Sequence, residues 1–425
     1  MNPAIIIKMK KLIYLFALSL IANITIAQEP LKKTVFIIVD GIPVDIIHKA
    51  STPNLDRIEK EGVFLESYVG GERGGYSQTP TISSNGYATL ITGTWVNKHN
   101  VWDNGIDDPN YNYPTIFRLY KDAYPEGKTA IYSTWLDNRT KLLGEGLDAT
   151  GNLKIDYAFD GLELDTLNYP HDKHSYYIKR IDAEVAIEAA KSIYKNGPEL
   201  SWVYLQFTDD ESHRYGDSPE FFNSITYHDA LVGLIYDAVK QREEEFNEEW
   251  LVVVATDHGR TPITARSHGG QSDSERNTWF VLNKKDINEY ARNYRTAGVD
   301  LLPTISDFMD IEIDQNTRYE LDGLSLFNTV EAFGLKGTLI DNNKILLSWS
   351  AIDKKADTTA EVLISTTNNI KEGKPDTYKK IGEVQIKEET ALLPINVPKG
   401  SEFVKVVLKT PNHTLNYWVK SVSSK

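Results

Sequence analysis

Three apolar segments of this chain each lead into an aspartate, and this repeated pattern limits the fold more than any other feature of the sequence. The three pairs are residues 35–39 before Asp40, residues 203–207 before Asp209, and residues 251–255 before Asp257. Short apolar runs rich in β-branched residues predict buried strands of a parallel sheet. Ligands of an open α/β sheet collect at the carboxyl ends of its strands. The pattern therefore predicts an α/β fold, with a mostly parallel sheet between helices and a carboxylate-rich site at one edge of the sheet.

Histidines accompany two of these aspartates. His213 follows Asp209 by four residues, which would place both on one face of a helix or around an ion in a loop, while His258 is adjacent to Asp257 and His268 is ten residues further on. Carboxylates and imidazoles are common ligands of catalytic metal ions. Two non-metal alternatives are open: Asp40 could cap a helix, and residues 209–216 could form a solvated acidic loop. We interpret the full set as a two-metal site and the chain as a metallohydrolase.

Composition restricts the function further. The 425 residues carry a formal net charge of −14, which disfavours binding to nucleic-acid polymers. The chain contains no cysteine, which excludes a disulfide, a cysteine-type zinc site and a thiol nucleophile. An anionic substrate would need a local positive centre, and bound divalent metal ions would provide one.

The N-terminal residues 1–27 are predicted to be a signal peptide. Lys8, Lys10 and Lys11 precede an apolar stretch at residues 12–22, and small residues around Ala27 offer a cleavage site. The apolar stretch is short for a transmembrane helix, although an uncleaved membrane anchor is the alternative. We therefore expect a periplasmic or secreted protein without a stable membrane span.

Two domains are expected after the signal peptide. Strand-like and helix-like stretches alternate through residues 28–333, with helices expected at 55–61 and 183–194. Residues 334–425 contain short, partly alternating strand patterns at 344–349, 361–364, 403–408 and 416–419. The second region is predicted to be a small all-β sandwich similar to a fibronectin type III module.

The order of the motifs resembles that of the alkaline phosphatase superfamily, in particular its type I phosphodiesterase/nucleotide pyrophosphatase branch. Thr52-Pro53-Asn54-Leu55-Asp56 resembles the first-helix signature, and residues 302–305 and 322–326 resemble the closing segments. The resemblance implies an alkaline-phosphatase-like fold and two divalent metal ions, with Zn²⁺ expected. It assigns to the first ion Asp40, Asp257 and His258, and to the second Asp209, His213 and His268.

The same resemblance implies a serine nucleophile. Within residues 80–93, Ser83 matches the position at which relatives carry a threonine or serine, and it would also contact the first metal ion. Ser84 and Thr81 are the alternatives, and all three hydroxyls could instead cap a helix. Asn104 matches an amide that binds a phosphoryl oxygen. The implied mechanism passes through a covalent phospho-serine.

The expected substrate is a small phosphate ester or diester. The chain lacks the Cys/Ser-x-Pro-x-Arg motif of sulfatases, and Asp137-Asn138-Arg139 carries aspartate where monoesterases carry the lysine of a Lys-x-Arg pair. This difference favours a phosphodiesterase over a phosphomonoesterase, a phosphotransferase or a non-catalytic binding protein. Candidate residues for stacking a nucleotide base are Tyr111, Tyr113, Trp135 and Tyr176. The sequence specifies neither the natural substrate nor the oligomeric state.

Overall fold

The computed structural model describes residues 29–341 and 343–420; the predicted signal peptide lies outside the described residues. An eight-stranded sheet with the order β4-β3-β5-β1-β6-β7-β2-β8 forms the centre of the larger region. Its strands are β1 (Leu31–Val39), β2 (Val63–Tyr68), β3 (Thr129–Ser133), β4 (Tyr157–Phe159), β5 (Leu200–Leu205), β6 (Glu248–Ala255), β7 (Asn277–Leu282) and β8 (Thr296–Ala297). Only β7 runs antiparallel to the other strands of this sheet. The predicted mostly parallel sheet is thus confirmed.

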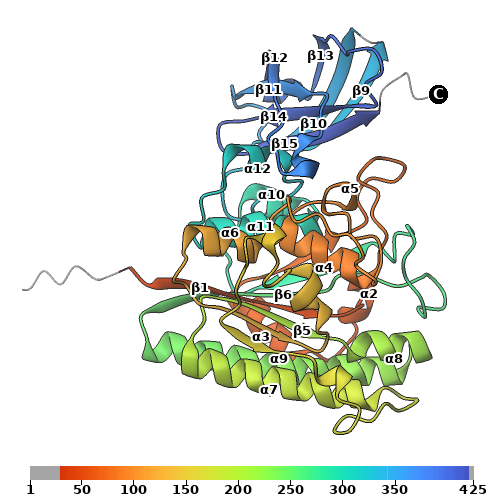
Figure 1. Ribbon diagram of the computed structural model, residues 1–425, viewed down its shortest axis with the longest axis vertical. Helices are drawn as coiled ribbons and strands as arrows, with labels where there is room; N and C mark the ends of the chain where they lie inside the picture. The colour runs from red at the N-terminus through yellow and green to blue at the C-terminus, as the bar shows by residue number, and fades with distance from the viewer. Residues whose placement is uncertain (1–28, 342, 421–425) are drawn as a thin grey trace, which may run out of the picture.

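Helices cover both faces of the sheet (Figure 1). One layer contains α2 (Val44–Ile47), α3 (Pro53–Glu61), α7 (Tyr176–Asn196), α8 (Phe207–Tyr215) and α9 (Pro219–Glu245). The opposite side carries α4 (Ser83–Thr92), α5 (Val96–His99), α6 (Ile116–Ala123), α10 (Glu289–Asn293), α11 (Leu301–Phe308) and α12 (Gln315–Glu320). Short helical turns complete this region: η1 (Asn138–Leu142), η2 (Asp148–Thr150), η3 (Leu162–Leu164) and η4 (Gly298–Asp300). Two large apolar clusters fill the space on the two sides, because the central strands are buried on both faces.

One predicted strand is longer than the observed one. The apolar run at residues 203–207 was expected to be strand throughout, but β5 ends at Leu205 and α8 begins at Phe207. The buried carboxylate of Asp182, on α7, accepts the N–H groups of Gln206 at 3.1 Å and Phe207 at 2.8 Å. These bonds satisfy donors at the start of the helix, so the chain turns two residues early.

Two antiparallel sheets form the C-terminal sandwich, which lies beyond the α4–α6–α11 side of the larger region (Figure 1). One sheet contains β9 (Ala332–Asp341), β10 (Lys344–Ala351) and β13 (Thr390–Pro394). The other contains β11 (Thr359–Ser365), β12 (Lys379–Gln385), β14 (Phe403–Lys409) and β15 (Thr414–Lys420), and the turns η5 (Asn369–Glu372) and η6 (Ile386–Glu388) connect strands. The four predicted strand patterns correspond to β10, β11, β14 and β15, whereas β9, β12 and β13 were not anticipated. The fibronectin-type likeness and the domain boundaries stay predictions.

Candidate active site

Three neighbouring parallel strands bring the predicted residues to one edge of the sheet. The strand β1 pairs with β5 on one side and β6 on the other, with Val39 opposite Leu205 and Ile38 opposite Ala255. Asp40 directly follows β1, one residue separates Asp257 from the end of β6, and Asp209 lies in the first turn of α8 after β5. Parallel pairing therefore gathers the three carboxylates at the carboxyl ends of adjacent strands.

The first cluster consists of Asp40, Asp257 and His258, all buried. The Nε2 atom of His258 lies 3.4 Å from Asp40 Oδ1 and 3.3 Å from Asp257 Oδ2. Both of these carboxylate oxygens are buried and lack a hydrogen-bond partner among the described residues. Buried polar atoms are normally satisfied. Three potential ligand atoms thus converge on a point where the protein itself supplies no donor.

The other carboxylate oxygens of this cluster are firmly held. The Tyr204 hydroxyl donates to Asp40 Oδ2 at 2.7 Å, and the Tyr87 hydroxyl donates to the same atom. The Gly41 N–H donates to Asp257 Oδ1 at 3.1 Å. Burial and the neighbouring carboxylates raise the pKa of Asp40 well above its ordinary value, and burial raises the pKa of Asp257 to about 7. A cation between the two would stabilise both as anions.

The second cluster consists of Asp209, His213 and His268. Asp209 and His213 lie four residues apart on α8, so they share one face of the helix. The Nε2 atom of His213 is 3.4 Å from Asp209 Oδ2, and that of His268 is 3.7 Å from Asp209 Oδ1. His213 is exposed, so this cluster is accessible to solvent whereas the first is buried. The structure thus brings together both predicted ligand sets.

The three histidines share a tautomer suited to metal binding. Each places Nδ1 within 2.8–3.0 Å of a backbone carbonyl, which can only accept, so Nδ1 carries the proton and Nε2 a lone pair. The carbonyls belong to Arg266 for His213, Gly259 for His258 and Thr81 for His268. Burial lowers the pKa of His258 and of His268, which keeps both imidazoles neutral. Neutral imidazoles with the second nitrogen held by a hydrogen bond are the usual form of a metal ligand.

The contact between His213 and His268 tests whether a cation fits the second cluster. Their Nε2 atoms lie 3.0 Å apart, although both nitrogens carry lone pairs in this tautomer. Two facing lone pairs repel each other, and a divalent cation coordinated by both would remove that repulsion. Together with the unpaired oxygens of the first cluster, this geometry fits divalent metal ions at both positions.

Arg260 balances part of the negative charge and was not anticipated from the sequence. Its fully buried guanidinium forms an ion pair with the Asp209 carboxylate and donates from Nε to the Gly41 carbonyl at 3.1 Å. Burial alone would raise the pKa of Asp209, but nearby positive charge, chiefly that of Arg260, outweighs burial and lowers it. Arg260 therefore keeps Asp209 ionised and fixes its orientation.

Ser83 is the hydroxyl that reaches the clusters. It is the first residue of α4, and its Oγ lies 3.1 Å from His258 Nε2. The positive end of the helix dipole faces this position and would favour an alkoxide or a bound anion there. The two alternatives differ: the Ser84 hydroxyl is buried without a partner among the described residues, and the Thr81 hydroxyl binds Gly269 and Gly270. The geometry thus distinguishes Ser83 from its neighbours.

Asn104 lies beside the same helix end. Its Oδ1 accepts the backbone N–H of Ser84 at 3.1 Å, and the side chain is exposed. This bond fixes which side of the amide faces the helix and leaves the Nδ2 donor without a protein partner in the described part of the chain. An amide held in this way next to Ser83 could donate to a phosphoryl oxygen.

The predicted substrate-binding residues outside the two clusters differ in whether they are available to a ligand. Arg139 pairs with Asp160 at 2.7 Å and with Glu145 at 2.5 Å, so its charge is already neutralised by two carboxylates. Tyr113 is only 3% exposed, which makes it unavailable for stacking a base and corrects that prediction. Tyr176 is 53% exposed and packs against Phe207 at the start of α8, which keeps it a candidate.

Several supporting residues carried no recognisable signal. Tyr87, Tyr204 and Asp182 act through contacts between distant segments, which no local motif encodes. Arg260 could have been suspected, because it follows the Asp257-His258-Gly259 motif directly and charged residues are seldom fully buried without a partner.

Comparison with known proteins agrees with this geometry. Residues 34–303 match the family described as type I phosphodiesterase / nucleotide pyrophosphatase. An uncharacterised pyrophosphatase/phosphodiesterase of Schizosaccharomyces pombe is 20% identical over 349 residues, covering 69% of this chain and 68% of that protein. Ectonucleotide pyrophosphatase/phosphodiesterase family member 7 of Mus musculus is 23% identical over 257 residues, covering 55% of this chain and 51% of its own length. The chain thus spans about half the length of the mouse relative.

A solved structure shows the same fold. The phosphonate monoester hydrolase of Agrobacterium radiobacter superposes with a TM-score of 0.50 at 14% identity, covering 91% of this chain and 89% of that protein. Among the described residues, no helix combines the length and apolar character that crossing a membrane requires.

Proposed function

The chain belongs to the type I phosphodiesterase/nucleotide pyrophosphatase family, and we propose that it is an exported two-metal phosphodiesterase that acts through a phospho-serine intermediate. Family membership supports hydrolysis of phosphoric esters. The observation that carries the finer proposal is the Ser83 hydroxyl, which lies at the start of α4 and 3.1 Å from the Nε2 atom of His258. A nucleophile therefore adjoins a cluster that lacks its own cation.

Each proposed metal ion would have three protein ligands. Asp40, Asp257 and His258 would hold the first ion near Ser83, and the second cluster, Asp209, His213 and His268, would hold the other. Zn²⁺ suits these mixed carboxylate and imidazole sets. When bound, the ions would lower the pKa of the serine hydroxyl and of water, and would neutralise charge on the phosphoryl group.

The protein groups then account for two displacements. Ser83 Oγ loses its proton and forms a bond to phosphorus as the bond to one alcohol of the diester breaks. The leaving alkoxide takes up a proton, and the second ester group stays on the phospho-serine. Water next attacks the same phosphorus, restores the Ser83 hydroxyl and releases the phosphate product. Asn104 would donate from Nδ2 to a phosphoryl oxygen as negative charge develops there. The positive end of α4 would stabilise the same charge.

A diester is the preferred substrate class. A monoester dianion carries an additional negative charge and needs more cationic groups around it. Arg139, the one candidate cation from the sequence, is bound to Asp160 and Glu145. A phosphomonoesterase remains the second candidate because it would use the same metal ligands. A nucleotide pyrophosphatase is the diesterase type that the family description supports.

The proposal extends to the organisation of the chain. Residues 1–27 would direct export to the periplasm or outside the cell, residues 28–333 would form the catalytic domain, and residues 334–425 the sandwich. Whole-cell fractionation with N-terminal sequencing of the mature protein tests this part. A mature chain that retains residue 1 in the cytoplasmic fraction would contradict it.

The decisive experiment compares bis-p-nitrophenyl phosphate with p-nitrophenyl phosphate as substrates of zinc-loaded protein, with and without a chelator. We expect chelator-sensitive activity that favours the diester. Preference for the monoester would reassign the enzyme as a phosphomonoesterase, and activity that survives chelation would refute metal dependence.

Matched serine variants test the nucleophile. Ser83→Ala should lower kcat by a factor on the order of 10³ or more, because the other hydroxyls that contact the first cluster, those of Tyr87 and Tyr204, are held by Asp40. Ser84→Ala, one residue away and equally small, should leave kcat within about tenfold of the wild type. Mass spectrometry after an acid quench of the reaction with bis-p-nitrophenyl phosphate should detect a p-nitrophenyl phosphoryl group on residue 83 of the wild type. An active Ser83→Ala enzyme would exclude the covalent mechanism.

A further inference from the structure

A cavity lies between the catalytic region and the sandwich, and none of the residues of the two carboxylate–histidine clusters lines it. Its volume is about 640 Å³, within the range of about 300–1,000 Å³ typical of small-molecule sites. The catalytic region contributes Tyr68, Arg276 and Arg295, and the sandwich contributes Phe333, Tyr417 and Trp418. Boundaries between domains are common positions for ligand sites.

The sheet explains how the two sites are related. Tyr68 ends β2, where it lies opposite Asn277 at the start of β7, and it pairs with Ala297 of β8. Because β7 runs antiparallel, these positions lie at the same edge of the sheet as the clusters. The strand β2 is two positions from β6, which corresponds to about 10 Å within the sheet. The cavity therefore lies at the same edge of the sheet as the candidate active site and shares no residue with it.

Two arginines in this cavity have no carboxylate partner. Arg276 donates to the Val69 carbonyl at 3.0 Å, and Arg295 donates to the Ser67 carbonyl at 2.7 Å and to the side-chain amide of Asn277. Within the described residues, neither guanidinium forms an ion pair. Burial lowers the pKa of both groups and outweighs the opposing effect of the nearby carboxylates, which are Asp273 for both arginines and Glu66 for Arg295.

The other charged groups of the cavity neutralise each other or are satisfied internally. Lys336 pairs with Glu72 at 3.2 Å. Asp322 binds Lys98 at 2.6 Å. Arg73 pairs with Asp273 at 2.5 Å, and Asp273 is an acid whose charge also acts on Arg276.

Asp300, the remaining acid, accepts hydrogen bonds from Tyr290 at 3.0 Å and from two backbone N–H groups, and burial raises its pKa to about 7. The unbalanced charge of the cavity is thus positive, on a protein whose net charge is −14.

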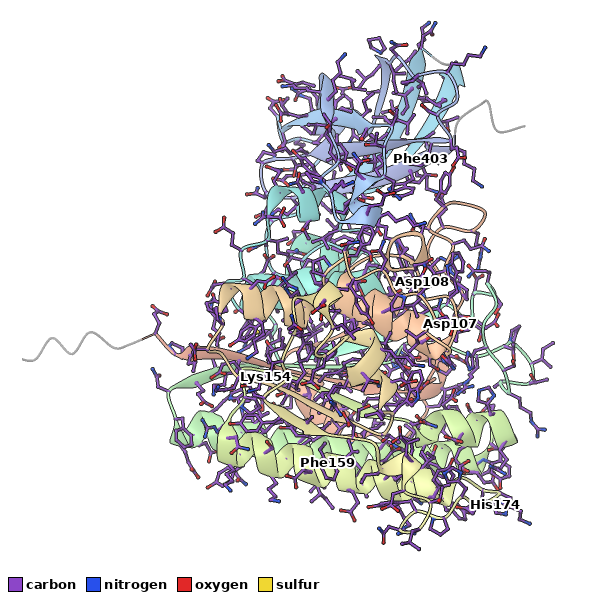
Figure 2. The ribbon with its side chains drawn as sticks, in the orientation of Figure 1. Asp107, Asp108, Lys154, Phe159, His174 and Phe403 are labelled. Carbon is purple, nitrogen blue, oxygen red and sulfur yellow. The ribbon has the colours of Figure 1, made fainter. Side chains whose placement is uncertain are left out.

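Aromatic rings accompany the two guanidinium groups. Both lie over the ring of Tyr68, at 5.7 Å for Arg276 and 5.9 Å for Arg295. Trp418 and Phe403 stack at 4.9 Å on the opposite, sandwich side; Figure 2 labels Phe403 on the sandwich near the catalytic region. Tyr76 of the catalytic region contacts both of these rings, at 5.9 Å and 6.2 Å, and so links the two walls. Aromatic faces bind the apolar faces of sugar rings, and arginine forks bind carboxylates and phosphates.

We propose that this cavity is a binding site for an anionic sugar, that is, a sugar ring carrying a phosphate or carboxylate, free or as part of a nucleotide. Arg276 and Arg295 bind the anionic group, and the ring of Tyr417 packs against the sugar. The ring of Trp418 is held between Phe403 and the Lys405 ammonium, at 4.9 Å and 4.6 Å, and supports this wall of the cavity. This site is independent of the proposed esterase activity, because it shares no residue with the clusters.

The test is isothermal titration calorimetry of the full protein with glucose 6-phosphate, glucuronate, AMP, glucose and inorganic phosphate. We expect glucose 6-phosphate or glucuronate to bind at least about tenfold more tightly than glucose or phosphate. AMP binding more tightly still, with the same arginine dependence, would identify the nucleotide form as the source. Equal binding of glucose, equal binding of phosphate, or no binding of any probe at millimolar concentration would overturn the proposal.

Matched variants locate the binding. Arg276→Gln and Arg295→Gln should each weaken binding at least about tenfold. Arg180→Gln is the control, since Arg180 is also exposed and donates to a backbone carbonyl but lies on α7 on the other side of the sheet. Thermal unfolding of each variant detects misfolding. If Arg276→Gln proves unstable, the variant at the exposed Arg295 provides the test.

A variant of the active site separates this proposal from the proposed function. Asp257→Asn disrupts the first cluster and should bind the probes as the wild type does. Loss of binding in Asp257→Asn together with retention in both arginine variants would place the ligand in the active site and overturn the proposal. Esterase activity measured in parallel is judged separately, so failure of either proposal leaves the other testable.

Discussion

Buried acids have a lysine partner at the contact between the larger region and the sandwich, but no cationic partner at the edge of the central sheet. At the contact, the Nζ atom of Lys405 lies 2.8 Å from Glu320 and 2.7 Å from Asp376, and all three side chains are buried. At the sheet edge, Asp40 and Asp257 are equally buried but face no cationic side chain within the described residues. Where buried carboxylates only stabilise the fold, this protein pairs them with a lysine.

The difference is informative because an uncompensated buried carboxylate is costly. Acids that only stabilise a fold are expected to have partners, as Glu320 and Asp376 do. Acids left without a cationic partner, beside imidazoles whose lone pairs also converge, indicate that the missing positive charge comes from outside the chain. The contrast supports a metal role for the sheet edge more strongly than the presence of acids alone would.

The largest expected effect concerns the contact with the sandwich. Lys405→Met leaves Glu320 and Asp376 buried without their cation, and we expect a loss of about 3–5 kcal/mol in the free energy of unfolding. Urea denaturation followed by tryptophan fluorescence measures this loss.

Lys380→Met is the matched control. Lys380 also bridges two acids of the sandwich, Glu361 and Glu383, each at 2.7 Å, but all three groups are exposed. Its removal should have little measurable effect on stability. Equal destabilisation by the two variants would break the comparison, since burial would then make no difference.

Loss of one metal ion should have the next largest effect, and should act on the sheet edge alone. Zinc present at about 100 times its dissociation constant would stabilise the protein by about 2.7 kcal/mol per site, and a chelator would remove this stabilisation. In Asp257→Asn the stabilisation by the first metal ion should be lost. Without metal, this variant should be more stable than the wild type, because asparagine removes the repulsion between the carboxylates of residues 40 and 257. Calorimetry with and without chelator, combined with metal analysis, measures both effects. Identical unfolding temperatures in zinc and in chelator would refute the external-cation interpretation.

The smallest expected effect concerns His99, a buried group that stays neutral and therefore needs neither a lysine partner nor a bound metal ion. Its imidazole is buried, Nδ1 accepts the Val101 N–H at 3.1 Å, and burial lowers its pKa to about 3 from an ordinary value of 6.5. As the pH falls below about 6.5, the unfolded chain binds a proton at this histidine, whereas the folded chain does not. The free energy of unfolding is therefore highest above pH 6.5 and declines below it. Between pH 6.5 and pH 5 the loss should be about 2 kcal/mol.

The variant His99→Gln should flatten this part of the stability profile, because glutamine keeps an acceptor and a donor but does not titrate. His48→Gln, at an exposed histidine, is the control and should leave the profile unchanged. Urea denaturation at a series of pH values measures both variants. A wild-type profile that is already flat between pH 6.5 and pH 5 would disprove the prediction.

The sequence predicted the candidate site better than it predicted the sandwich. Apolar runs ending in Asp40, Asp209 and Asp257 are local signals, and the expectation of a parallel sheet was enough to place them at one edge. The strand β12, Lys379–Gln385, has no comparable signal, because most of its residues are exposed and polar. Its place in the sheet depends on pairing with β11, which a single segment does not reveal.

The sequence by itself determined which residue types could bind metal, their positions at strand ends, and the absence of thiol chemistry. Only the tertiary structure decided which hydroxyl reaches the clusters, that Arg260 pairs with Asp209, and that Arg276 and Arg295 share a cavity with rings from the sandwich. The physical reason is the range of the interactions. Strand ends and motifs follow from neighbours along the chain, whereas ion pairs, orphaned oxygens and cavities arise between segments that meet only when the whole chain has folded.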